Sequence, residues 1–201
     1  MAVGISALRL NTTGNTNIAI GREALSLNTT GGSNTAVGPA LLSNSTGNRN
    51  TAVGFALSSN TTGSFNTAIG DNANVSTGTL TNATAIGANS LVNASNKVRI
   101  GSSAVTVVEV PVAVTVSSDR RLKNNIADTE LGLDFILKVR PVQYTMKQGN
   151  GKTDFGFIAQ ELKDVLGDRN VNMLNKDGEF YTVRYNDLLS PMVKAIQEQQ
   201  K

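Results

Sequence analysis

Small apolar residues recur at a nearly fixed interval through the first half of the chain. A triplet of alanine, valine or isoleucine, and glycine begins at Ala2, and the same pattern or its last echo ends at Gly4, Gly21, Gly38, Gly54, Gly70, Gly87 and Gly101. A second motif, Asn-Thr/Ser-Thr-Gly, stays in phase with it and ends at Gly14, Gly31, Gly47 and Gly63. A period of roughly 16 to 17 residues is too short for a pair of helices but fits one coil of two short strands and two turns. The pattern therefore predicts a β-solenoid over residues 1–103.

Each rung of this solenoid offers only a few apolar side chains. The expected core of two of the rungs consists of Val37, Leu41 and Leu42, and of Val53, Phe55 and Leu57. So thin a core would struggle to offset the conformational entropy of the chain, whereas burial of one apolar face against two identical coils would help. An asparagine also stands at one position of successive rungs, where side-chain amides can form a hydrogen-bonded ladder: Asn17, Asn34, Asn50 and Asn66.

The pattern changes after the repeats. Two β-branched runs, residues 104–110 and 112–116, flank Pro111 and predict two strands joined at a kink, so that residues 104–117 form a junction. Residues 118–201 mix helix and strand patterns and predict a small α+β domain that ends in a helix. Its expected elements are a helix capped by Asp128 or Thr129, strands at 142–146 and 155–158, a turn at 148–151, a helix at 159–166, a hairpin at 173–183 and a last helix capped by Asn186.

The last helix carries an apolar stripe with two interpretations. Leu188, Leu189, Met192, Val193 and Ile196 share one face, which suits either ordinary core packing or the start of a three-stranded coiled coil. Both interpretations stay open at the level of sequence.

Charge and composition exclude several classes of function. Residues 1–117 hold five basic and three acidic residues, and residues 118–201 hold thirteen and twelve, so the net charge of +3 forms no basic stripe for nucleic acid. The chain has no cysteine and no histidine, which excludes disulfides, serine-histidine triads and the usual zinc sites; we expect no metal and no cofactor. A catalytic base would have to be Lys, Asp, Glu or Tyr. No apolar run approaches the roughly 20 residues of a membrane helix, and the start does not look like a signal peptide.

Two stretches resemble known families. The run Ser118-Asp119-Arg120-Arg121-Leu122-Lys123-Asn124-Asn125-Ile126, with residues 131–133 and 155–162, resembles the intramolecular chaperone domain at the C-terminus of endosialidases, phage tail spikes and tail fibres. The phrase Asn-Thr-Ala-Val/Ile-Gly is similar to the head repeats of trimeric autotransporter adhesins, which wind as a left-handed β-roll. The resemblances imply a homotrimeric fibre, with a chaperone domain at 118–201 that cuts itself off by means of a serine-lysine dyad, and they identify Ser118 and Lys123 as that dyad.

The chemistry of the dyad sets conditions on its geometry. A free lysine has a pKa of about 10.4, so it must be buried or lie near other cations before it can serve as a base. Five residues apart on an α-helix, two side chains point about 140° from each other. Ser118 must therefore lie in a strand end or turn, with Lys123 folding back or supplied by a neighbouring chain. The Ser118 hydroxyl reaches the carbonyl of Ser117 through a five-membered ring, so we expect cleavage at the bond between Ser117 and Ser118.

The preferred hypothesis is the C-terminal part of a phage tail fibre or spike, or of a similar surface fibre, that folds as a trimer and then releases its chaperone domain. Its expected location is the virion tail, or alternatively the bacterial cell surface. The alternative is a structural or adhesive trimer whose dyad is inactive; a membrane-anchored transcription factor with the same module lacks support. Met1 enters the repeat in mid-phase, so a longer fibre is expected. Through the full-length fibre it could bind a host-surface glycan or receptor, for which Phe55 and Phe65 are the aromatic residues in the coils; no nucleic acid and no membrane insertion are expected.

Overall fold

The chain divides into two compact units. The computed structural model describes residues 1–147 and 149–200. One unit is Met1–Thr106 and the other is Val107–Lys201. Gln148, the first residue of the turn expected at 148–151, lies outside the described residues. The fold class predicted from the sequence is confirmed: a parallel β-solenoid is followed by a small α+β region that ends in a helix.

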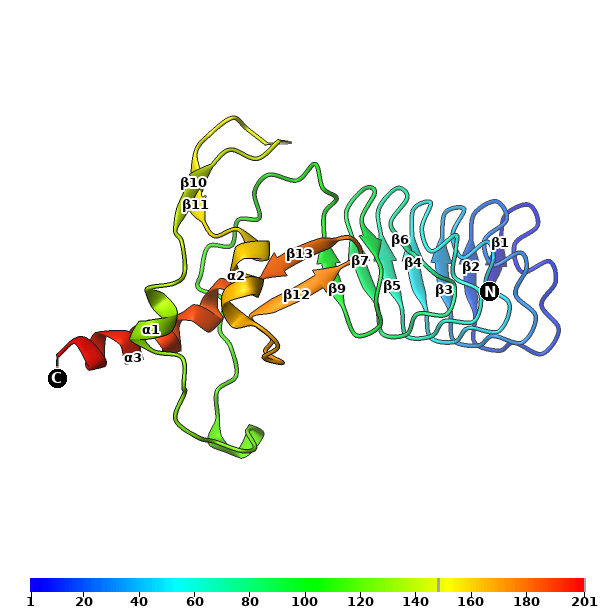
Figure 1. Ribbon diagram of the computed structural model, residues 1–201. Coiled ribbons are helices and arrows are strands. Elements are labelled where there is room, and N and C mark those ends of the chain that lie inside the picture. The colour runs from blue at the N-terminus through cyan, green and yellow to red at the C-terminus, as the bar shows by residue number, and fades with distance from the viewer. Residues whose placement is uncertain (148, 201) are drawn as a thin grey trace. The chain divides into compact units, whose positions relative to one another are not determined.

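The first unit is a stack of short parallel strands (Figure 1). Seven strands form one wall, in the order β1 (Ala2–Val3), β2 (Ile18–Ile20), β3 (Thr35–Val37), β4 (Thr51–Val53), β5 (Thr67–Ile69), β7 (Thr84–Ile86) and β9 (Val98–Ile100). A second, two-stranded sheet pairs β6 (Asn74–Val75) with β8 (Leu91–Val92). The register aligns each triplet with the next, for example Ala36 with Ala52. The repeat period of the sequence is therefore the circumference of one rung.

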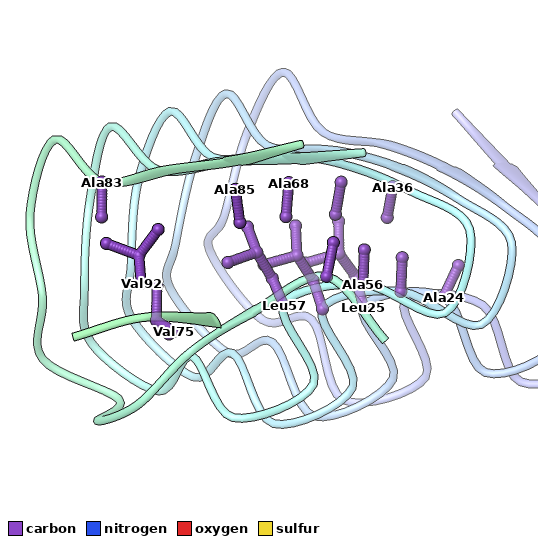
Figure 2. Close-up of a cluster of buried hydrophobic side chains, with 14 of the residues drawn as sticks. Ala24, Leu25, Ala36, Ala56, Leu57, Ala68, Val75, Ala83, Ala85 and Val92 are labelled. Atoms are coloured by element: carbon purple, nitrogen blue, oxygen red, sulfur yellow. The ribbon is translucent and has the colours of Figure 1, made fainter. Parts of the chain in front are cut away.

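Alanine and leucine fill most of the interior of the coil, and Val75 and Val92 join them in the later rungs. Successive residues of a strand point to opposite faces, and in the rungs from β3 to β7 the alanine of the triplet points inward while the valine or isoleucine points outward. Figure 2 shows strand alanines such as Ala68 facing Leu57 across the interior. Leu41 and Leu57 are fully buried as expected, whereas the assignment of Val37, Val53 and Phe55 to the core is wrong, because all three are exposed. A narrow coil has room for a methyl group on its strand wall but not for a second bulky side chain.

The predicted asparagine ladder is present and runs between side chains and backbone. The amide oxygens of Asn17, Asn34 and Asn50 each accept a hydrogen bond of 2.9 Å from the backbone N–H of the equivalent residue one rung later. Each also donates through Nδ2 to a glycine carbonyl, as Asn50 does to Gly63 at 2.8 Å. A second ladder joins the asparagines of the Asn-Thr/Ser-Thr-Gly motif, for example Asn44 Nδ2 to Asn28 Oδ1 at 2.8 Å. The rungs are thus held in register by buried amides.

The two glycine motifs serve different needs. Gly38 adopts a φ of 97°, a conformation that a Cβ penalises. Gly47 has no such φ, but a Cβ there would lie within 3.0 Å of the carbonyl oxygen of Gly63 in the next rung. The first motif is needed for a turn and the second for the close stacking of rungs.

The junction differs from its prediction. No residue from 101 to 119 lies in a strand, so the strands expected at 104–110 and 112–116 do not form in the single chain. A strand needs a partner for its backbone amides, and Pro111 has no N–H to offer. The valines of this segment are exposed instead: Val105, Val107, Val108, Val110, Val112, Val114 and Val116.

The second unit packs helices against short antiparallel hairpins. Its described residues form the 3-10 helix η1 (Arg120–Leu122), α1 (Leu133–Ile136), β10 (Val142–Tyr144), β11 (Asp154–Gly156), α2 (Ala159–Leu166), β12 (Leu174–Asp177), β13 (Phe180–Val183), the 3-10 helix η2 (Tyr185–Leu188) and α3 (Leu189–Gln199). Strand β10 pairs with β11, and β12 pairs with β13. The core of the unit consists of Phe135, Leu162, Leu166, Met173 and Leu188.

The expected helix caps at Thr129 and Asn186 are wrong. Thr129 accepts a hydrogen bond from the backbone of Leu131 before the helix begins, and the N-terminus of α1 is instead met by Glu198, whose carboxylate accepts from Leu133 N at 2.7 Å. Asn186 lies inside η2 rather than at the start of α3. The bounds of α2 and the hairpin at 173–183 are as predicted.

Candidate active site

The structure brings Ser118 and Lys123 together within one chain. Lys123 Nζ donates a hydrogen bond of 2.7 Å to Ser118 Oγ. One turn of 3-10 helix, η1, separates them, and its two flanking residues, Asp119 and Lys123, have extended backbones. A 3-10 turn between extended residues reverses the chain, which a continuous α-helix would not do. Of the two arrangements left open by the sequence, the single chain adopts the one in which Lys123 folds back.

Asp119 holds this turn in place. Its carboxylate accepts hydrogen bonds from the backbone N–H of Arg121 at 2.8 Å and from the Arg121 guanidinium at 2.7 Å. The backbone closes the turn, because Lys123 N donates to the carbonyl of Arg120 at 3.1 Å. The hydrogen bonds from Arg121 keep the pKa of Asp119 below its usual value, so the clip is intact at neutral pH.

Sequence reasoning did not select Asp119 or Arg121 as part of the site. The sequence pattern that could have indicated this role is the aspartate at position 119, two residues before the backbone N–H of Arg121, as at an ordinary N-cap. Without the structure, a pair so close in sequence is not distinguishable from two solvated charges.

The site is open to solvent in the single chain. Ser117, Ser118 and Lys123 are all exposed. A serine hydroxyl becomes a nucleophile when a neighbouring base takes its proton, and an amine can do so only in its neutral form. The contact between Lys123 and Ser118 has the required reach, with the amine acting as donor in the arrangement observed.

Glu161 and Asp164, which could be taken for an acid pair, have different surroundings. Arg140 binds the Glu161 carboxylate through Nε at 3.0 Å and through Nη2, and these hydrogen bonds lower the pKa of Glu161. The pair ties α2 to the segment before β10, while Asp164 is exposed. Arg140 and Glu161 therefore form a structural ion pair.

The described residues offer neither a membrane-spanning helix nor a cluster of acidic metal ligands. In residues 1–147 and 149–200, no helix is both long and apolar enough to cross a membrane. The same residues contain no group of three or more acidic side chains placed to hold a metal ion.

Comparison with known proteins bears on the C-terminal region. Neither the curated proteins nor the solved structures give a match to the chain. A family model described as chaperone of endosialidase matches residues 118–170, so the match begins at Ser118 and includes Lys123, α1, β10, β11 and α2. Residues 118–170 are thus similar to the endosialidase chaperone domain, and they follow a β-solenoid.

Proposed function

We propose that this chain is the C-terminal part of a trimeric phage tail fibre or spike, or of a similar surface fibre, whose chaperone domain assembles the β-solenoids and then releases itself by cleavage next to Ser118. The observation that carries the proposal is the 2.7 Å contact between Lys123 Nζ and Ser118 Oγ at the first residue of the chaperone match. Assembly in vivo would place the product on the virion tail or a cell surface.

The proposed cleavage is a single turnover. The neutral Lys123 amine takes the hydroxyl proton of Ser118 while Oγ attacks the carbonyl carbon of Ser117. The C–N bond of the Ser117–Ser118 peptide breaks, the Ser118 nitrogen receives the proton as an amine, and an ester joins the two residues. Water then hydrolyses the ester, leaving a carboxylate on Ser117 and a free serine on the released domain. Once the chaperone domain has separated from the fibre, the fibre cannot go back along its assembly pathway, so it is kinetically trapped.

The outer face of the solenoid wall supports the trimer. Val37, Val53, Ile69 and Ile86 form an exposed apolar row along the parallel sheet, beside a column of half-buried threonines. Parallel sheets are normally covered on both faces. Two further copies of the same coil would cover this row without any other partner.

Two apolar surfaces of the second unit are also exposed. The exposed valines of the junction alternate in the manner of strands but have no partner strand. Of the predicted stripe only Leu188, at the end of η2, is in the core, whereas Leu189, Met192, Val193 and Ile196 on α3 are 46% to 59% exposed. Apolar residues at this spacing on a free helix face suit a three-stranded coil. The structure thus favours the coiled-coil interpretation of the stripe over core packing.

Denaturing gel electrophoresis and native mass spectrometry of freshly expressed protein test the proposal. The wild type should yield one fragment that ends at Ser117 and one that begins at Ser118, together with a trimeric mass. Ser118→Ala and Lys123→Ala should remain uncut and trimeric, while Ser102→Ala, which also removes a serine hydroxyl but lies outside the chaperone match, should cut normally. A trimeric wild type that stays whole would refute cleavage, and a monomeric one would refute the assembly.

A second candidate is a trimeric structural or adhesive fibre that is never cut. The exposure of Ser117, Ser118 and Lys123 favours it, because the single chain does not exclude water from the two side chains. The gel separates the two candidates: an intact trimer identifies the structural fibre.

A further inference from the structure

One corner of the solenoid repeats a left-handed backbone conformation. The residue before each ladder asparagine, or its equivalent in the later rungs, has φ between 55° and 61° at Thr16, Ser33, Arg49, Phe65, Asn82 and Asn96. Asparagine tolerates this conformation better than other residues with a Cβ. Thr16, Ser33, Arg49 and Phe65 are therefore the members of the column that the backbone itself disfavours, and Arg49 and Phe65 stand in consecutive rungs.

These two side chains contact each other at the surface. The Arg49 guanidinium lies 5.3 Å from the centroid of the Phe65 ring, and both side chains are exposed. Among the described residues Arg49 forms no ion pair. The acidic residues of the repeat region are Glu23, which pairs with Arg22 at 3.6 Å, and Asp71. Phe65 thus holds a guanidinium whose charge no carboxylate of the solenoid neutralises.

A hollow lies beside this pair. Gly32 occupies a column in which the neighbouring rungs have Asn15, Asn48 and Ser64, and these residues line a depression of about 350 Å³. Its rim carries amide and hydroxyl groups from Asn15, Ser33 and Ser64 together with Arg49 and Phe65. The Asn48 oxygen already accepts a hydrogen bond from Gly32 N at 2.8 Å, which fixes the floor of the hollow.

We infer that this hollow binds a carboxylate-bearing sugar. Guanidinium groups pair with carboxylates in a forked geometry, an aromatic ring packs against the apolar face of a pyranose, and amides and hydroxyls bind sugar hydroxyls. Here all three occur within one depression on a surface with few acidic groups. The hollow belongs to the solenoid alone, so binding there is independent of trimer release at Ser118.

Two substitutions test the site without the risk of unfolding. Arg49→Asn and Phe65→Asn place at the corner the residue already found at Asn82 and Asn96, so both variants should melt at or above the temperature of the wild type. Arg22→Gln is the matched control, because it removes an exposed arginine that is paired and lies outside the hollow.

Saturation-transfer NMR and calorimetric titration of the full chain would use three probes: D-glucuronate, D-glucose and inorganic phosphate. Glucuronate should bind at least about tenfold more tightly than glucose, as expected for one charge-assisted pair. Arg49→Asn should lose that preference, Phe65→Asn should weaken glucuronate several-fold, and Arg22→Gln should bind as the wild type does. Equal binding of glucose and glucuronate, unchanged binding by Arg49→Asn, or phosphate binding as tight as glucuronate and indifferent to Phe65→Asn would each overturn the inference.

Discussion

Replacement of Asn50 by alanine tests whether buried amides hold the rungs together. The Asn50 side chain is fully buried, accepts from Asn66 N at 2.9 Å and donates to the carbonyl of Gly63 at 2.8 Å. Alanine leaves the Asn66 N–H without an acceptor inside the coil, whereas the Gly63 carbonyl keeps a hydrogen bond of 3.0 Å from Asn60 Nδ2. A buried, unsatisfied group costs about 1–3 kcal/mol, so the substitution should lower the free energy of unfolding by about that amount. The space vacated by the amide can admit a water molecule, which places the expected loss near the lower end.

Two measurements check this loss. Chemical denaturation should show a lower midpoint for Asn50→Ala, and hydrogen exchange resolved by peptide should show faster exchange in the rungs that contain residues 50 and 66 than in the first two rungs. The repeats contact only their neighbours, so the effect should be strongest locally. Thr62→Ala, at an exposed turn of the next rung, is the control. If Asn50→Ala unfolds at the same midpoint as Thr62→Ala and exchanges no faster, the ladder does not stabilise the coil.

Two further predictions concern the glycine stack and the turn before the dyad. Gly47→Ala should destabilise the solenoid by about 3 kcal/mol in the same denaturation assay, because its Cβ would meet the rigid carbonyl of Gly63. Gly32→Ala is the milder comparison, because its Cβ would lie 3.1 Å from the side-chain oxygen of Asn15, and equal midpoints for the two variants would contradict the argument. Asp119→Ala should slow self-cleavage about tenfold through loss of the cap on η1, whereas Asp119→Asn retains an acceptor for Arg121 N and should cut faster than the alanine variant. Equal rates in a timed gel assay would show that the turn does not depend on this carboxylate.

The sequence predicted the structure correctly where a motif repeats along the chain. The period of the Ala-Val/Ile-Gly triplet predicted the rung, and the recurrence of Asn34 and Asn50 at one position predicted a ladder. Periodicity does not say which residues of a short triplet face inward, so Val37 and Val53 were placed in the core although they point outward. Two-residue alternation leaves both choices open until the width of the coil is known.

Prediction failed where the partner lies far along the chain or outside it. Thr129 looked like a cap for α1, but the acceptor at that helix is Glu198, far beyond Leu133 in the sequence, and no local pattern points to it. The valine runs on either side of Pro111 have strong β-propensity, yet a strand also needs a neighbour, and the single chain supplies none. Propensity describes what a segment can become, whereas its state depends on what lies beside it.

The position of the junction relative to the dyad connects assembly to cleavage. Val116, Ser117 and Ser118 are consecutive and all exposed, so any strand pairing between chains that covers Val116 would also withdraw the neighbouring hydroxyl from water. The amine that contacts this hydroxyl would lose solvent at the same step, so both members of the dyad would be shielded from water together. An unassembled chain would then keep its dyad together but hydrated and inactive. If the chain assembles and cuts itself as proposed, burial of the valine junction would be the trigger, and the hydrogen bond between Lys123 and Ser118 would keep the two side chains together until that burial occurs.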